Sequence, residues 1–110
     1  NGIASLTNTL GEVARQSGIS ATDGKTIKLN GRTYFAFTAY TANVGAFFRV
    51  ADVTDNQAAA ITNPIMNVLM PSTQANGNLT MDADMAIING KLHAVFVCTN
   101  IGMRFYKLEQ

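Results

Sequence analysis

Two side chains of this sequence belong to types used in nucleophilic catalysis, and each occurs once. They are His93 and Cys98, in the stretch KLHAVFVC. A Cys–His catalytic pair needs both groups side by side, whereas residues five apart on one strand point to opposite faces. Cys98 would share its face with Leu92, Ala94 and Phe96. We therefore expect a buried, inert thiol, a structural histidine and no catalytic residue.

A pair of carboxylates is the second candidate for chemistry. Asp82 and Asp84 lie two positions apart on one face of an expected strand, and Asp52 and Asp55 could add further oxygens. Such a group could bind a cation, but Asp82-Ala83-Asp84 lacks the glycine and the terminal glutamate of an EF-hand loop. A solvated strand face is the simpler interpretation. We expect no metal site and no cofactor.

The composition narrows the classes of function further. The chain has 110 residues, enough for one domain, and 47% of them are hydrophobic, which argues against disorder. Charged residues make up 14%, well below the usual proportion, as suits surfaces buried between subunits. The net charge of +1, without a basic run, gives no reason to expect nucleic acid. No long apolar run is present, so we expect no membrane insertion.

The elements that position these residues are mostly strands. Apolar and polar residues alternate with period two over residues 26–108, and Asn30-Gly31 and Asn89-Gly90 are strong hairpin signals. We predict an antiparallel β-sandwich or barrel of six to eight short strands with a short N-terminal helix. The first hairpin spans residues 25–42, and residues 19–24 are expected to form a turn. Further strands are expected at 44–53, 65–70, 79–88, 91–98 and 103–108, and residues 58–61 could form one helical turn.

Four aromatic side chains of this region allow two interpretations. Tyr34 and Tyr40, with Phe47 or Phe48, could form an exposed patch that binds sugar or peptide. Alternatively they pack between sheets or subunits. Both faces of the predicted strand at 33–40 carry aromatic rings, which favours burial on both sides.

The N-terminal stretch has a different period. Ile3, Leu6, Leu10 and Val13 are spaced three, four and three, which predicts a helix at residues 3–16. We therefore divide the chain into an N-terminal helix at 1–18 and an antiparallel β domain at 19–110. The helix could fold back on its own sheet, or it could end a parallel coiled coil that leads into a β tip. The narrow spacing favours the coiled coil, as does a start at Asn1, which suggests a shaft upstream.

A short heptad helix, an Asn/Thr-rich β region and the C-terminal strand GMRFYKLEQ together resemble the distal domains of trimeric bacteriophage tail fibres, spikes and needles. The resemblance implies a homotrimer and contact with a host surface molecule. It also implies a place on a virion or outside the cell.

The leading hypothesis is therefore a non-enzymatic structural and attachment module, a trimeric β knob that contacts a cell-surface glycan or protein. Binding residues would lie in polar loops at the end remote from the helix. The candidates are Asp55 and Asn56 in the loop 52–57, and Gln74 and Asn76 in the loop 72–78. The alternative is a small monomeric binding or inhibitory protein that acts on a host protein.

Overall fold

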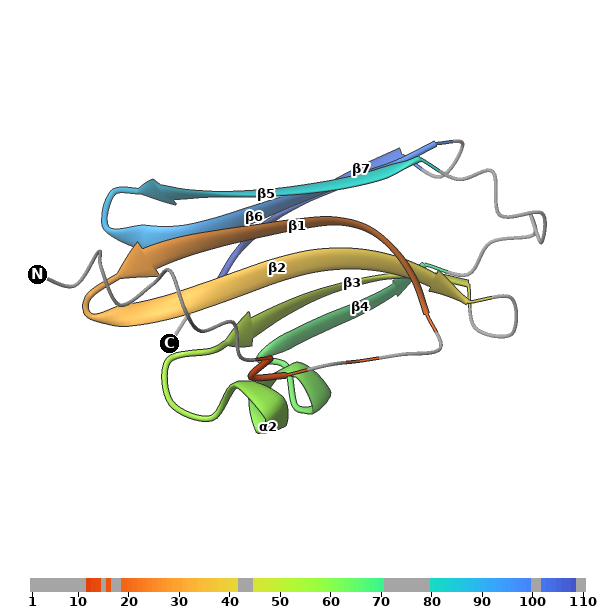
Figure 1. The fold of residues 1–110 in the computed structure, drawn as a ribbon. Helices are drawn as coiled ribbons and strands as arrows, with labels where there is room; N and C mark the ends of the chain where they lie inside the picture. Colours follow the sequence, from red (N-terminus) through yellow and green to blue (C-terminus); the bar gives the residue numbers. More distant parts are fainter. Residues whose placement is uncertain are drawn as a thin grey trace, which may run out of the picture.

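The computed structural model describes residues 12–14, 16, 19–41, 45–70, 80–99 and 102–108. Within these ranges the chain is mainly β, with strands in two antiparallel sheets and one short helix (Figure 1). The described elements are β1 (Ser20–Leu29), β2 (Arg32–Thr41), β3 (Gly45–Asp52), α2 (Gln57–Thr62), β4 (Met66–Met70), β5 (Met81–Ile88), β6 (Lys91–Cys98) and β7 (Gly102–Lys107). The prediction of a mainly β fold is confirmed, and the described strands form two separate sheets rather than a closed barrel.

The first sheet has the order β1-β2-β3-β4, and the second has the order β5-β6-β7. Each sheet contains one of the two predicted hairpins. Asn30 and Gly31 turn with φ angles of 52° and 78°, and Asn89 and Gly90 turn with φ angles of 52° and 74°. Positive φ at both central residues is the geometry that two-residue hairpin turns require and that Asn-Gly adopts readily. Both hairpin predictions are confirmed.

The turn expected at residues 19–24 is wrong. Strand β1 begins at Ser20 and pairs with β2 through a register shift between Ala21 and Asp23. Gly24 stays in the strand because its missing side chain leaves room for a ring: a Cβ there would lie 2.9 Å from Cε1 of Phe35. Residues that favour turns in isolation thus become part of an edge strand with an irregular register.

The two sheets share one hydrophobic core. The inward-facing side chains of β2 and β3 pack on those of β5 and β6, and the rings of Phe48 and Phe96 stack with centroids 4.7 Å apart. Burial of one such ring contributes about 1.5–3 kcal/mol. The buried members of this core are Tyr34, Ala36, Tyr40, Ala46, Phe48, Val50, Met81, Ala83, Met85, Leu92, Ala94, Phe96 and Cys98.

Side chains of β1 join the edges of the two sheets. The Thr22 hydroxyl donates to the carbonyl of Met81 at 3.0 Å, and the carboxylate of Asp23 accepts the backbone N–H of Ala83 at 2.9 Å. The ammonium of Lys25 lies 2.9 Å from the same carboxylate. The hydrogen bond from Ala83, helped by Lys25, lowers the pKa of Asp23. A backbone donor at the edge of the second sheet thereby gains a partner without strand pairing.

The outer face of the first sheet is covered by the chain that precedes β1. Phe37 and Phe47 are 5% and 4% exposed there, and Ile19 packs against them. The guanidinium of Arg49 lies 4.4 Å from the centroid of the Phe47 ring and donates to the side-chain oxygen of Gln16. Strand β2 is therefore apolar and covered on both sides, which confirms the preference for aromatic burial.

The helix expected at residues 3–16 is not found in its described part. Residues 12–14 and 16 lie in neither a helix nor a strand, and Val13 is 70% exposed. A glycine such as Gly11, which precedes them in the sequence, weakens a helix by about 1 kcal/mol, and Gln16 instead accepts a hydrogen bond from Arg49 of the first sheet. Ile3, Leu6 and Leu10 lie outside the described residues, so the coiled coil and the trimer contact remain predictions.

The connection between β3 and β4 contains the described helix. The expected turn at residues 58–61 falls within α2, and the strand expected at 65–70 is β4. Among the residues that the structure describes, no helix has the length and apolar character needed to cross a membrane.

Candidate functional site

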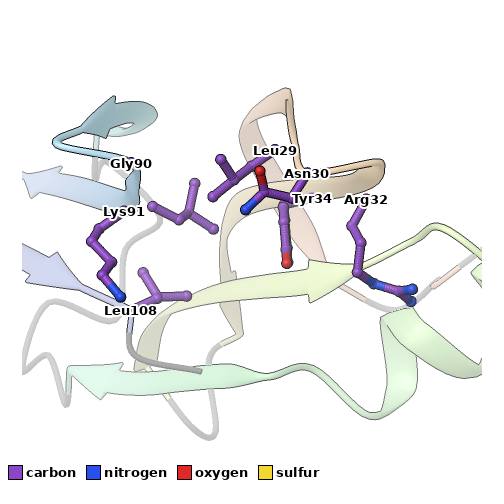
Figure 2. Close-up of a pocket in the computed structure, with 8 residues that line it drawn as sticks. Leu29, Asn30, Arg32, Tyr34, Gly90, Lys91 and Leu108 are labelled. Carbon is purple, nitrogen blue, oxygen red and sulfur yellow. The ribbon is translucent and has the colours of Figure 1, made fainter.

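Both hairpin turns and the loop 52–57 lie at one end of the two sheets, here called the hairpin end (Figure 1). A pocket of about 140 Å³ opens between the turns, as Figure 2 shows. Residues of the β1–β2 hairpin, of the β5–β6 turn and the start of β6, and one residue after β7 form it, so both sheets contribute. Its lining is Leu29, Asn30, Arg32, Tyr34, Gly90, Lys91, Leu92 and Leu108.

The pocket has an apolar floor and a polar rim. Leu29, Leu92 and Leu108 belong to the core or pack against it, and they form the floor with the ring of Tyr34. The side chains of Arg32 and Lys91 lie at opposite sides of the opening (Figure 2). A cavity of this size can hold a small apolar group such as a single ring, while the rim offers donors to polar substituents.

The loop 52–57 is held beside this pocket by hydrogen bonds from its own side chains and from β2. Arg32 donates from Nε to Asp52 and, at 3.0 Å, from Nη2 to Asp55. Asp52 also accepts the backbone N–H and the hydroxyl of Thr54, at 3.1 and 2.6 Å. The Thr54 hydroxyl in turn accepts the backbone N–H of Thr33 at 2.8 Å. The loop is therefore fixed to the sheet at several points.

These contacts stabilise the charged forms of two side chains at the hairpin end. The hydrogen bond from Arg32, with those from Thr54, lowers the pKa of Asp52. The two carboxylates beside it raise the pKa of Arg32. Both shifts favour the charged forms and so support the ion pairs between these groups.

The predicted site residues differ in what they can offer a ligand. The side chain of Asp55 is 79% exposed although its carboxylate forms an ion pair with Arg32. The side-chain oxygen of Asn56 accepts the backbone N–H of Ala59 at 3.1 Å and so caps α2, which leaves its amide N–H groups for other partners. Gln74 and Asn76 lie outside the described residues.

The structure separates the strand ends that flank the two predicted binding loops. Asp52 pairs with Tyr34 near the hairpin end, whereas Met70 pairs with Ala46 at the opposite end of the sheet. The loop 72–78 lies outside the described residues, so the expectation that both loops share one tip stays a prediction. Arg32 and Lys91 were not expected as site residues, and Tyr34 was considered only as part of an exposed aromatic patch. The positions of Arg32 and Lys91 directly after the two Asn-Gly turns are the signal that could have indicated them.

The remaining candidates for chemistry lie on the second sheet. Cys98 is buried, as predicted, and burial raises the pKa of its thiol. His93 lies on the other face with Nδ1 3.0 Å from the carbonyl oxygen of Lys91. Asp82 and Asp84 are exposed on that same outer face. Within the described residues, no group of three or more His, Cys, Asp or Glu side chains is arranged to hold a metal ion.

Comparisons of the chain with protein-family models, with curated proteins and with solved structures found no match.

Proposed function

We propose that this chain is a structural and attachment module without enzymatic activity. It is a β-sandwich knob of a viral or secreted fibre that assembles as a homotrimer and binds a cell-surface glycan or protein. The observation that carries the proposal is the braced loop 52–57, which presents an exposed carboxylate beside the pocket at the hairpin end.

A braced polar loop suits recognition of a polar surface molecule. Ordering a loop on binding has an entropic cost, which a loop already held by Arg32 and Thr54 largely avoids. The Asp55 carboxylate can accept hydrogen bonds from hydroxyl groups, and the floor of the pocket can receive an apolar face or a methyl group. Sugars carry both kinds of surface, so a glycan fits this end as well as a protein does.

Assembly as a homotrimer would strengthen a weak contact of this kind. Three copies held together raise the effective concentration of the second and third binding events by avidity. In this proposal the heptad residues Ile3, Leu6, Leu10 and Val13 meet near the trimer axis, and the module works on a virion or outside the cell.

The second candidate is a small monomeric protein that binds or inhibits a host protein. It is favoured by the path of the N-terminal segment, in which Gln16 accepts a hydrogen bond from Arg49 of the chain's own sheet. A segment held in this way covers its own domain and leaves the hairpin end for a partner protein.

Binding assays with the intact protein test the attachment role. We expect binding to a glycan array or to whole cells, and we expect Asp55→Ala combined with Asn56→Ser to weaken it at least tenfold. Serine at position 56 still caps α2, so the fold is kept while the amide is lost. Gln74→Ala and Asn76→Ala test the second loop separately. Thr99→Ala, at the opposite end, is the matched control.

Three outcomes separate the candidate functions. Binding that survives all of these changes would place the contact elsewhere on the molecule. Capture of a host protein without cell binding would favour the inhibitory role. No binding to any array or cell would contradict the attachment role.

A further inference from the structure

The pocket at the hairpin end has a basic rim. Among the described residues that line it, Arg32 and Lys91 are basic and none is acidic, and their side chains lie at opposite sides of the opening (Figure 2). The depression beside β5 has the reverse character, because three aspartates and one lysine line it. An anionic group therefore has a favourable place at the hairpin end and an unfavourable one beside β5.

The two cations differ in what is already bound to them. Arg32 donates to Asp52 and Asp55 of the loop 52–57, so two carboxylates offset its charge. Lys91 is exposed and forms no ion pair within the described part of the chain. One side of the pocket thus presents a cation without a carboxylate partner, and the other side presents the exposed carboxylate of Asp55.

The floor of the pocket sets the size and the surface of what can enter it. Leu29, Leu92 and Leu108 form this floor with the ring of Tyr34, and the volume is about 140 Å³. An apolar cavity of about 150 Å³ accepts a benzene ring, so this floor can cover one face of a six-membered ring. A bare phosphate or sulfate ion has no apolar surface and gains nothing from such a floor.

We propose that the pocket at the hairpin end binds a sugar residue that carries a carboxylate, such as a uronic or sialic acid unit of a cell-surface glycan. The carboxylate of the sugar pairs with the ammonium group of Lys91. The C–H groups on one face of the sugar ring pack on the leucines of the floor, and hydroxyl groups on the far side of the ring donate to Asp55. The inference rests on the proposed attachment function and names the class of glycan.

An acidic sugar is favoured over other ligands because it matches both sides of the rim at once. A neutral sugar leaves Lys91 without a partner, and a ligand that is anionic all round is repelled by Asp55. A lysine ammonium is a compact charge on a flexible stem, which suits a single carboxylate. Because Lys91 is exposed, each ion pair is weak, and several copies of the contact are needed for firm attachment.

Matched glycans test the charge of the ligand. The intact protein is applied to an array of glycans that contain uronic or sialic acids, each printed beside the same glycan with its carboxyl group reduced to an alcohol. We expect at least one acidic glycan to bind, and we expect its reduced counterpart to bind at least fivefold more weakly, the size of one exposed ion pair. Equal binding within each pair, or binding to neutral glycans alone, would overturn the inference.

Variants of the rim test whether Lys91 recognises that charge. Lys91→Met keeps the length of the side chain and removes its charge, so it should bind an acidic glycan and its reduced counterpart alike. Lys91→Arg keeps the charge and should keep the preference. Lys28→Met is the matched control, because Lys28 is an exposed lysine of the same hairpin that does not line the pocket, and it should also keep the preference. Thermal melting confirms that each variant is folded.

The salt dependence of binding gives a second readout with the same proteins. Raising the ionic strength should weaken binding of the acidic glycan to the parent, because salt screens an exposed ion pair. It should affect Lys91→Met much less. A preference for the acidic glycan that persists in Lys91→Met, with an unchanged salt dependence, would overturn the role of Lys91 and with it the inference.

Failure of this inference differs from failure of the attachment role. Cell binding that persists in Lys91→Met, and after glycosidases have removed the acidic sugars from the cells, would overturn the acidic-sugar ligand and leave the attachment role intact. Absence of binding to any glycan and to any cell would contradict both.

Discussion

The outer faces of the two sheets both carry large apolar side chains, yet among the residues that the structure describes these side chains are buried on one face and exposed on the other. On the first sheet, Phe37 and Phe47 lie beneath Ile19, with Arg49 stacked on the Phe47 ring. On the second sheet, Met103 and Phe105 are largely exposed. Apolar residues on both faces of a strand thus indicate that another segment or molecule packs on each face. They do not say whether the cover comes from the same chain.

Removing one aromatic ring from each outer face should distinguish the covered face from the exposed face most clearly. Phe47→Ala should lower the free energy of unfolding by about 3 kcal/mol, because the ring is buried and a cavity would remain. Phe105→Ala should lower it by less than about 1 kcal/mol when measured on dilute, monomeric protein, because the ring already contacts water. Denaturant unfolding of both variants gives the comparison. Equal losses would mean that the two faces are covered to the same extent.

Thiol labelling should sharpen the comparison between the inside and the outside of the second sheet. Cys98 is buried and burial raises the pKa of its thiol, so a thiol reagent should modify it slowly in the native protein. A cysteine at the exposed position next to it, in the variant Thr99→Cys with Cys98→Ala, should react roughly 100-fold faster, because no local opening is needed. Similar rates at the two positions would show that this sheet opens readily.

The smallest expected effect concerns the contacts of Thr22 and Asp23 with β5, here called the seam between the sheets. The stability that the seam provides should depend on pH. The folded pKa of Asp23 is lowered, so its contribution is present above the unfolded value and is lost as pH falls below about 4. Asp23→Asn keeps an oxygen for the N–H of Ala83 but does not titrate. Its stability should therefore fall less steeply between about pH 4 and 2 than that of the parent. The residual slope belongs to groups such as Asp52, and identical slopes would contradict a role for Asp23.

The features that the sequence predicts well are those set by local rules. Asn-Gly turns need positive φ at two adjacent residues, so both hairpins could be located, and alternation with period two identified which side of β5 faces the core. The start of β1 was missed because Asp23 and Gly24 favour a turn when only their neighbours in sequence are considered. Pairing with the distant end of β2, and the space that Gly24 leaves for the Phe35 ring, keep them in a strand instead. The pocket was missed for a related reason, since its lining comes from three separate stretches of the chain.

The relative placement of the two candidate binding loops could have been reasoned further from the sequence. A single predicted strand lies between the loops 52–57 and 72–78, and one strand carries the chain from one end of a sheet to the other. The strand ends that precede these loops, at Asp52 and Met70, do lie at opposite ends of the first sheet. The bracing of Asp55 by Arg32 is different in kind, because it depends on the pairing of β2 with β3 and no local pattern indicates it.

The seam at β1 has a consequence for the order in which the chain folds. Each hairpin closes over a few residues, whereas Thr22 and Asp23 reach partners 59 and 60 positions away. Contacts between such distant segments require the loss of much chain entropy before they form. The hairpins should therefore form early and the seam late, after the rate-limiting barrier. Changes at the seam would then speed unfolding while leaving the folding rate nearly unchanged, so the seam controls how long the folded domain persists.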